Sequence, residues 1–181
     1  VNDMKLIGKH NYENVMAAIG VAMSMGIPMD IIISTVKEFK AVEHRIEYVR
    51  ELNGVVYYND SKGTNTDAAI KAIEAMTRPT ILIGGGYDKH SEYDDWVLAF
   101  KDRAKHLILL GATRNKIAEC AKKHGYDKIT FVSTLSEAVS LSAKIAESGD
   151  AVLLSPACAS WGQFDNYEQR GEMFKEYVRA L

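Results

Sequence analysis

The sequence has 181 residues, of which 47% are hydrophobic and 25% are charged, and its formal net charge is −2. This length suits one ordinary domain plus part of another, and the composition excludes disordered and fibrous proteins. A charge so close to zero argues against nucleic acid or an anionic membrane as a partner, so any anionic ligand must be held by local groups.

Two cysteines, Cys120 and Cys158, are too few for a disulfide scaffold and lack metal-ligand spacing. We therefore expect free thiols in the reducing cytoplasm and no metal site, with Cys158 a small buried residue rather than a nucleophile. No signal-peptide pattern is present, and the uncharged stretch 15–29 is too short to span a bilayer. The chain begins with Val1, which fits a processed product or an expressed fragment.

The first elements in chain order are helical. After residues 4–7, which are expected to end a strand, apolar residues with helical spacing predict one helix over 12–25 and a second over 29–39. The apolar face of the first helix consists of Val15, Ala18, Ile19, Ala22 and Met23, and that of the second consists of Ile32, Val36 and Phe39. Gly26 and Pro28 separate the two helices.

The composition changes at residues 40–47, which are polar and lack helical periodicity. We place a domain boundary there, which gives domains at 1–41 and 42–181, and we expect the linker to act as a hinge.

Beyond the boundary, short apolar runs alternate with amphipathic stretches. The runs predict strands at 55–58, 80–83, 106–110, 129–132 and 151–154. The stretches between them predict helices near 66–77, 94–104, 114–124, 135–148 and 167–180. This alternation indicates a Rossmann-like α/β fold, with a mostly parallel sheet covered by helices on both faces.

Ligands of such sheets bind at the carboxyl ends of the strands. Four predicted strands are followed there by small, hydroxyl-bearing or cationic residues, at 59–65, 84–89, 111–114 and 155–161. Any one of these segments could simply be a tight turn, but together they favour an anionic ligand. No segment matches G-x-G-x-x-G or a P-loop, which argues against a nicotinamide-dependent oxidoreductase.

Several motifs occur in a fixed order along the chain. They are HNYEN at 10–14, HR at 44–45, NDSKGTN at 59–65, GG at 85–86 with Lys89, and SPACAS at 155–160 followed by QF at 163–164 and NYEQRG at 166–171. Together they resemble the Mur ligases over nearly the whole chain, and the last motif resembles the member that adds D-glutamate. The resemblance implies that 1–41 ends a central ATPase domain and that 42–181 form the C-terminal Rossmann-like domain.

The resemblance also implies a reaction. ATP, with Mg²⁺, phosphorylates the terminal carboxylate of UDP-N-acetylmuramoyl-L-alanine, and the amine of D-glutamate attacks the acyl phosphate to give an amide, ADP and phosphate. This step belongs to peptidoglycan precursor synthesis, and we expect a cytoplasmic monomer. Because the P-loop and the metal ligands of the family are expected upstream of Val1, we expect this chain alone to be inactive.

The residues expected at the nucleotide are carried over from the resemblance. Asn14 would hydrogen-bond adenine, Arg45 would reach the phosphates, Asp60 would accept from the ribose, and Lys62 would face the nucleotide. Each of the first three also has a purely structural interpretation. Asn14 could be a helix-surface amide, Arg45 a solvated linker charge, and Asp60 a turn-forming aspartate. Asn11 is interpreted as either a helix cap or a ligand.

The residues expected at D-glutamate are Thr64, Lys89, Ser160, Trp161 and Tyr167. Lys89 and Ser160 would take the two carboxylates, and the two aromatic rings would wall the amino acid or pack on the following helix. No catalytic residue is assigned.

Two departures from the family pattern, Gly63 and Gly162, are expected to loosen their loops. A sibling ligase that adds another amino acid, including a folylpolyglutamate-type enzyme, stays open as an alternative. So does a non-catalytic α/β ligand-binding module.

Overall fold

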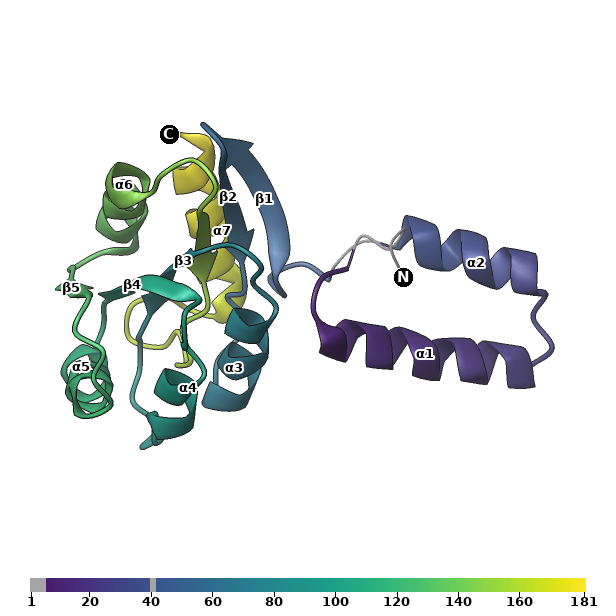
Figure 1. Cartoon of the computed structure of the whole chain (residues 1–181), viewed down its shortest axis with the longest axis horizontal. Coiled ribbons are helices and arrows are strands. Elements are labelled where there is room, and N and C mark those ends of the chain that lie inside the picture. The colour runs from purple at the N-terminus through teal and green to yellow at the C-terminus, as the bar shows by residue number, and fades with distance from the viewer. Residues whose placement is uncertain (1–5, 40–41) are drawn as a thin grey trace.

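The computed structural model describes residues 6–39 and 42–181, apart from the side chain of His10. Lys40 and Ala41, where the domain boundary was predicted, lie outside the described residues, as do Met4 and Lys5 of the expected first strand. Leu6 and Ile7, the described part of that strand, are not in a strand. The described chain forms a helical hairpin (residues 6–39) and an α/β unit (residues 42–181) that lies beside it (Figure 1).

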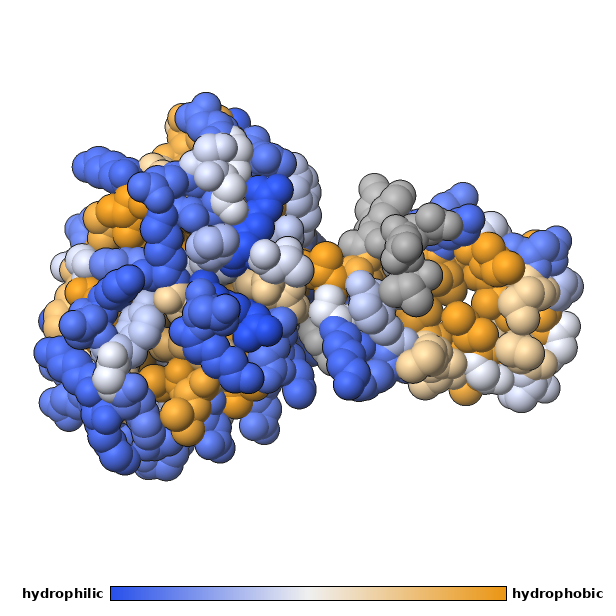
Figure 2. Space-filling model, in the orientation of Figure 1, coloured by the Kyte–Doolittle hydropathy of each residue, from blue (hydrophilic) through white to orange (hydrophobic). Residues whose placement is uncertain are grey.

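The helical hairpin consists of α1 (Lys9–Ser24) and α2 (Met29–Glu38). Gly26 adopts φ +74° in the connecting turn, and Pro28 precedes the first residue of α2, so the predicted stop between the helices is confirmed. Ile32 is buried, but many large apolar side chains of the hairpin are exposed, as the orange surface in Figure 2 shows. They are Met16, Val21, Met23, Met25, Ile27, Met29, Ile31, Ile33 and Phe39.

The α/β unit is built on a six-stranded sheet in the order β1-β2-β6-β3-β4-β5. The strands are β1 (Glu47–Leu52), β2 (Val55–Asn59), β3 (Thr80–Gly84), β4 (Ala104–Leu109), β5 (Ile129–Phe131) and β6 (Ala151–Leu154). All neighbours pair in parallel except β1, which pairs antiparallel with β2 at the edge. The helices are α3 (Thr66–Glu74), α4 (Asp94–Leu98), α5 (Arg114–Lys123), α6 (Leu135–Ile145) and α7 (Tyr167–Arg179).

Helices cover both faces of the sheet, as the sequence predicts (Figure 1). Successive side chains of a strand point to opposite faces, so Leu82 of β3 packs with α3, α4 and α5, whereas Ile81 and Ile83 pack with α6 and α7. Trp96 of α4 and Phe100, just beyond the end of that helix, are both buried, with ring centroids 5.1 Å apart. No helix in the described ranges has the length and apolarity needed to cross a bilayer.

β1 is not among the strands predicted from the sequence. Its residues are only partly buried, because an edge strand has one covered face, so the segment lacks the continuous apolar run of a central strand. The signal was present in the turn, where Asn53 (φ +53°) and Gly54 (φ +80°) both adopt left-handed conformations and join β1 to β2. Asn-Gly between two strand segments is the preferred two-residue hairpin turn. α4 is also shorter than predicted and ends at Leu98.

Candidate functional site at the carboxyl edge of the sheet

Four loops follow strands β2, β3, β4 and β6 at one edge of the sheet, and each of these strands has a parallel neighbour. We name them the β2 loop (59–65), the β3 loop (84–89), the β4 loop (111–114) and the β6 loop (155–161). Backbone hydrogen bonds join them: Gly85 N donates to Pro156 O (2.9 Å), Tyr87 N to Ala159 O (2.9 Å) and Thr113 N to Gly86 O (3.2 Å). The convergence expected at the carboxyl ends of parallel strands is therefore present, and the loops support one another.

Asp60 of the β2 loop lies beneath this edge rather than on its surface. Its side chain is buried; Oδ2 accepts from Ser155 Oγ (2.7 Å) and Oδ1 from Ile46 N (3.3 Å). Burial is the main cause that raises the Asp60 pKa, to about 7. The carboxylate thus ties the β2 loop to the β6 loop, and any ribose would share oxygens that already accept hydrogen bonds.

Gly63 packs directly against Asp60. A Cβ atom at this position would lie 2.4 Å from Asp60 Oδ2, closer than real contacts allow. Gly63 therefore permits a tight contact, and the expectation that it loosens the loop is wrong. Gly162, the other departure, adopts φ +86° with open space around it.

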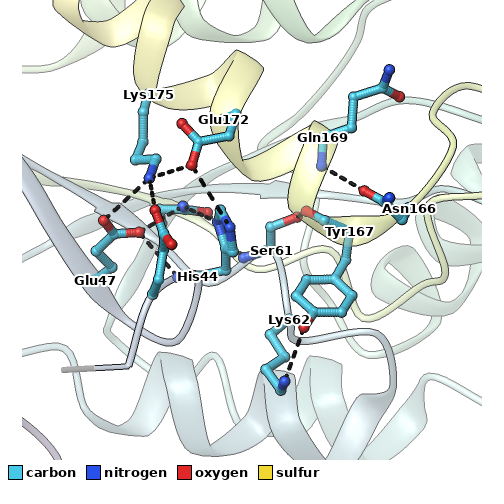
Figure 3. A network of polar contacts seen from close by, with 11 residues as sticks. His44, Glu47, Ser61, Lys62, Asn166, Tyr167, Gln169, Glu172 and Lys175 are labelled. Atoms are coloured by element: carbon cyan, nitrogen blue, oxygen red, sulfur yellow. Dashed lines mark hydrogen bonds and ion pairs between the residues drawn. The ribbon is translucent and has the colours of Figure 1, made fainter.

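Lys62 and Tyr167, assigned to different ligands, contact each other. Lys62 Nζ donates to Tyr167 Oη (3.0 Å) and lies 4.8 Å from the ring centroid (Figure 3). The Tyr167 ring also meets the edge of His44, with centroids 5.9 Å apart. Tyr167 therefore packs against groups of the β2 loop and the linker, where it sets the place of the Lys62 ammonium.

The linker is fastened to α7 by a second group of charges (Figure 3). Lys175, with a side chain 4% exposed, pairs with Glu172 (2.7 Å), Glu47 (3.4 Å) and Glu43. His44 is buried and its Nδ1 lies 3.0 Å from Asn59 Nδ2, which indicates a structural role. Lys175 was not predicted as part of the site, because no pattern in a sequence shows which lysine a fold will bury.

Asn14 and Arg45 line one cavity of about 460 Å³ between the helical hairpin and the linker. Both residues are exposed, so their polar groups are accessible from the cavity. The other lining residues are mostly apolar and include Val15, Val36 and Phe39. An apolar cavity with an amide and a guanidinium at its wall suits a flat heteroaromatic base attached to phosphates.

Asn11 also lines this cavity but does not cap α1. It lies within the first turn, and its Nδ2 donates to Ile7 O (2.7 Å), whereas Gly8 occupies the cap position. The cap interpretation is therefore wrong, and the reason is that α1 begins at Lys9.

The residues expected at D-glutamate lie on three of the four loops and the start of α7. Lys89 is exposed, and no polar partner of its ammonium is found in the described chain. Ser160 is buried beside the Tyr87–Ala159 bridge. Trp161 is 55% exposed and meets Tyr87 edge to face, with centroids 5.4 Å apart, so its ring packs against the β3 loop. Thr64 is half-buried, and Asn65 caps α3 by accepting from Ala68 N (2.8 Å).

Cys158 is buried, as expected, and its Sγ lies 3.2 Å from Tyr93 Oη and 3.3 Å from Thr113 Oγ1. Burial is the main cause that raises the pKa of this thiol. A neutral thiol is a poor nucleophile, so Cys158 serves the packing of the β6 loop.

Two clusters bring three possible metal ligands within 4.8 Å of one another, namely Asp94 with Cys120 and His124, and Glu43 with His44 and Glu172. An ammonium already lies against a carboxylate in each: Lys123 against Asp94 (2.9 Å) and Lys175 against Glu172 (2.7 Å). Neither is the oxygen-only set that Mg²⁺ prefers. Within the described ranges, these clusters do not fit a magnesium site.

Residues 44–158 match the family model of the Mur ligase, glutamate ligase domain. A UDP-N-acetylmuramoylalanine--D-glutamate ligase of Lachnospira eligens is 65% identical over 181 residues, and one of Lachnoclostridium phytofermentans is 60% identical. Both matches cover 100% of this chain and 40% of the relative, so the chain spans about two fifths of these proteins.

Solved structures share the fold at low identity. A UDP-N-acetylmuramate-alanine ligase of Thermotoga maritima matches with a TM-score of 0.72 at 16% identity, covering 98% of this chain and 39% of that one. A Mycobacterium tuberculosis folylpolyglutamate synthase, complexed with ADP and AMPPCP, matches with a TM-score of 0.68 at 14% identity, covering 94% and 41%.

Proposed function

This chain belongs to the Mur ligase family, and on that premise we propose that it forms the amino-acid-binding part, and one side of the nucleotide site, of an ATP-dependent ligase. The ligase adds D-glutamate to UDP-N-acetylmuramoyl-L-alanine. The observation that carries the proposal is the identity of 65% over all 181 residues to a protein named for this reaction. The loops at the sheet edge supply the groups that such a substrate requires.

The two structural units correspond to parts of two domains in this proposal. The helical hairpin is the end of the ATPase domain, residues 1–41, and the α/β unit is the C-terminal domain, residues 42–181. Exposed apolar side chains such as Met16, Ile31 and Ile33 support this division, because a hairpin that completes another domain needs an apolar surface to join it.

In the proposed site, adenine occupies the cavity beside Asn14 and the phosphates extend towards Arg45. Lys62, held by Tyr167, faces the transferring phosphoryl group. Positive charge at this point stabilises the charge that develops on the phosphoryl oxygens. The described residues do not supply the magnesium ligands, so these are assigned to the upstream part of the longer protein.

D-Glutamate is placed across the β3 and β6 loops. Its two carboxylates need separate donors if its amine is to be held in one orientation, and Lys89 and Ser160 flank the bridge between these loops. The exposed Tyr87–Trp161 pair and the hydroxyl of Thr64 complete the walls. Holding the amine in line with the acyl phosphate, and keeping water out, is the contribution of this part of the enzyme.

The test uses the longer protein that contains this chain. Amide formation from ATP and UDP-N-acetylmuramoyl-L-alanine is measured with D-glutamate and, in parallel, with other amino acids. We expect product with D-glutamate. Product with a different amino acid alone would assign the protein to a sibling ligase. The 181-residue chain, tested in the same assay, should form no amide and release no phosphate. If the longer protein bound these substrates without any turnover, the result would favour the non-catalytic ligand-binding module.

A further inference from the structure

Arg170 lies in the first turn of α7 and is 2% exposed beneath the loops of the site. Its Nε and Nη2 donate to Ser61 Oγ (2.9 Å) and Ser61 O (2.8 Å), and its Nη1 donates to Cys158 O (3.2 Å). One guanidinium therefore spans the β2 loop, which carries Lys62 and Thr64, and the β6 loop, which carries Ser160.

The contact extends to the third loop and to a strained backbone. A Cβ atom on Gly86 of the β3 loop would lie 3.5 Å from Arg170 Nη1, so this loop also passes close to the guanidinium. Ala157, just before the carbonyl that accepts from Nη1, has φ +56° and is buried. Non-glycine residues keep such a conformation only where their surroundings hold it.

The guanidinium is charged, yet all three of its hydrogen-bond acceptors are neutral oxygens. No ion pair of Arg170 is found across residues 6–39 and 42–181. Burial lowers its pKa to about 10, which still leaves it protonated at neutral pH. Asp60 is the carboxyl group whose charge acts on it, and burial raises the pKa of Asp60 to about 7, so that charge is only partly present near neutral pH. A buried cation without a full counter-charge favours an anion nearby.

We propose that Arg170 is a positioning residue for the amino-acid substrate. Its planar fork fixes the separation of the β2 and β6 loops, so that Thr64 and Ser160 hold the dicarboxylate with its amine in line with the acyl phosphate. Its charge adds to the attraction for this anionic ligand. The assignment deepens the proposed function and rests on it.

The proposal has a chemical consequence that a purely stabilising residue would not share. In the productive step, the amine nitrogen forms a bond to the acyl carbon, phosphate leaves, and one amine proton is lost. If the loops separate, water attacks the same carbon and regenerates the carboxylate with phosphate. Misplaced loops therefore raise the ratio of phosphate released to amide formed, whereas a smaller folded fraction lowers both equally.

The experiment compares R170K, R170M and wild type in the longer protein. R179K is the matched control, because Arg179 is an exposed arginine in the last turn of the same helix. The readouts are the Michaelis constants for D-glutamate and ATP, the phosphate-to-amide ratio and the melting temperature. An ammonium cannot reproduce a planar fork with three fixed donors. We therefore expect both Arg170 variants to raise the D-glutamate constant by about tenfold or more and to raise the ratio above one, with R179K unchanged.

A ratio of one with an unchanged D-glutamate constant in R170K would overturn the assignment. So would a loss of amide formation in full proportion to the loss of folded protein. If R170M does not fold, R170K decides the question by the same two readouts. If the wild type makes no amide with D-glutamate, the proposed function fails, and Arg170 is then judged by the same ratio measured with the amino acid that the protein does use.

Discussion

The helical hairpin and the α/β unit contain similar apolar residues but use them differently. Ile83 of β3 is fully buried between the sheet and its covering helices, whereas Ile33 of α2 is 48% exposed. The α/β unit closes a core on each face of its sheet, and the hairpin leaves much of its apolar surface uncovered (Figure 2). The difference indicates that the α/β unit is stabilised by its own core. The hairpin contributes little to the free energy of unfolding of this chain.

Matched substitutions give the largest expected effect. Ile83→Ala removes buried atoms and leaves a cavity, so it should lower the free energy of unfolding of this chain by about 2–5 kcal/mol. Ile33→Ala should change it by less than about 0.5 kcal/mol, as exposed substitutions do. Urea titration followed by circular dichroism measures both. Equal losses would show that the hairpin shares one cooperative core with the sheet.

The second prediction concerns pH and Asp60. Its folded-state pKa of about 7 lies above the unfolded value of about 3.9, so the folded state binds more protons between these values. The free energy of unfolding should therefore fall as pH rises from about 4 to about 7, by about 1 kcal/mol per unit, and stay level outside this window. Asp60→Asn cannot ionise. We expect its stability relative to wild type to improve by about 2 kcal/mol between pH 5 and pH 7.

Chemical denaturation at a series of pH values checks this result. Asp67, an exposed carboxylate in the first turn of α3, offers the control Asp67→Asn, for which no comparable trend is expected. A parallel pH profile for Asp60→Asn and wild type would show that the buried carboxyl is not the source.

The third prediction tests which of the two regions holds the linker. Lys175 joins Glu43 and Glu47 to α7, so Lys175→Met should lower the free energy of unfolding by about 1–2 kcal/mol, less than for a fully buried pair because the carboxylates reach solvent. Limited proteolysis should cut the linker faster. Lys71→Met, which removes an exposed pair with Glu74, should do neither. If Lys175→Met leaves cleavage unchanged, the linker is not held by this group, and the expected hinge extends through Glu47.

The sequence predicts those elements of the α/β unit whose burial shows in a short stretch of sequence. Runs such as 151–154 are apolar throughout because they are central strands buried on both faces, and the structure reproduces that strand to the residue. β1 failed as a prediction because a half-exposed edge strand does not show this pattern. The order of the strands depends on pairings across long stretches of chain, which no local pattern contains.

In the candidate site too, the features that follow from local sequence patterns were predicted, and those that depend on tertiary packing were not. The convergence of four loops follows from parallel strands and was predicted. Asn14 and Arg45, which the resemblance assigns to one ligand, line one cavity. No supporting role was predicted for Arg170 or Lys175, because they differ from surface cations only in what the fold packs around them. Asp60 is a similar case. Its position after a strand suggests an exposed acceptor, yet its carboxylate is buried, because it accepts from Ser155 and packs closely against Gly63.

The smallest expected effect compares the two regions as ligand sites, and it rests on the proposed function. Lys89 belongs to the α/β unit and Asn14 to the hairpin, and both are exposed. In the longer protein, Lys89→Ala removes a charge-assisted contact with a carboxylate, so it should raise the Michaelis constant for D-glutamate by about tenfold or more and leave that for ATP within a few-fold. Asn14→Ala removes neutral hydrogen bonds to adenine, so it should raise the ATP constant by about threefold to tenfold and spare that for D-glutamate. Steady-state kinetics with each substrate varied in turn measures both variants. Lys101→Ala, at an exposed lysine in the turn that follows α4, serves as the control. A crossed result, with Lys89→Ala weakening ATP alone, would move that ammonium to the nucleotide. If both variants weakened both substrates equally, Lys89 and Asn14 would not belong to separate amino-acid and adenine subsites.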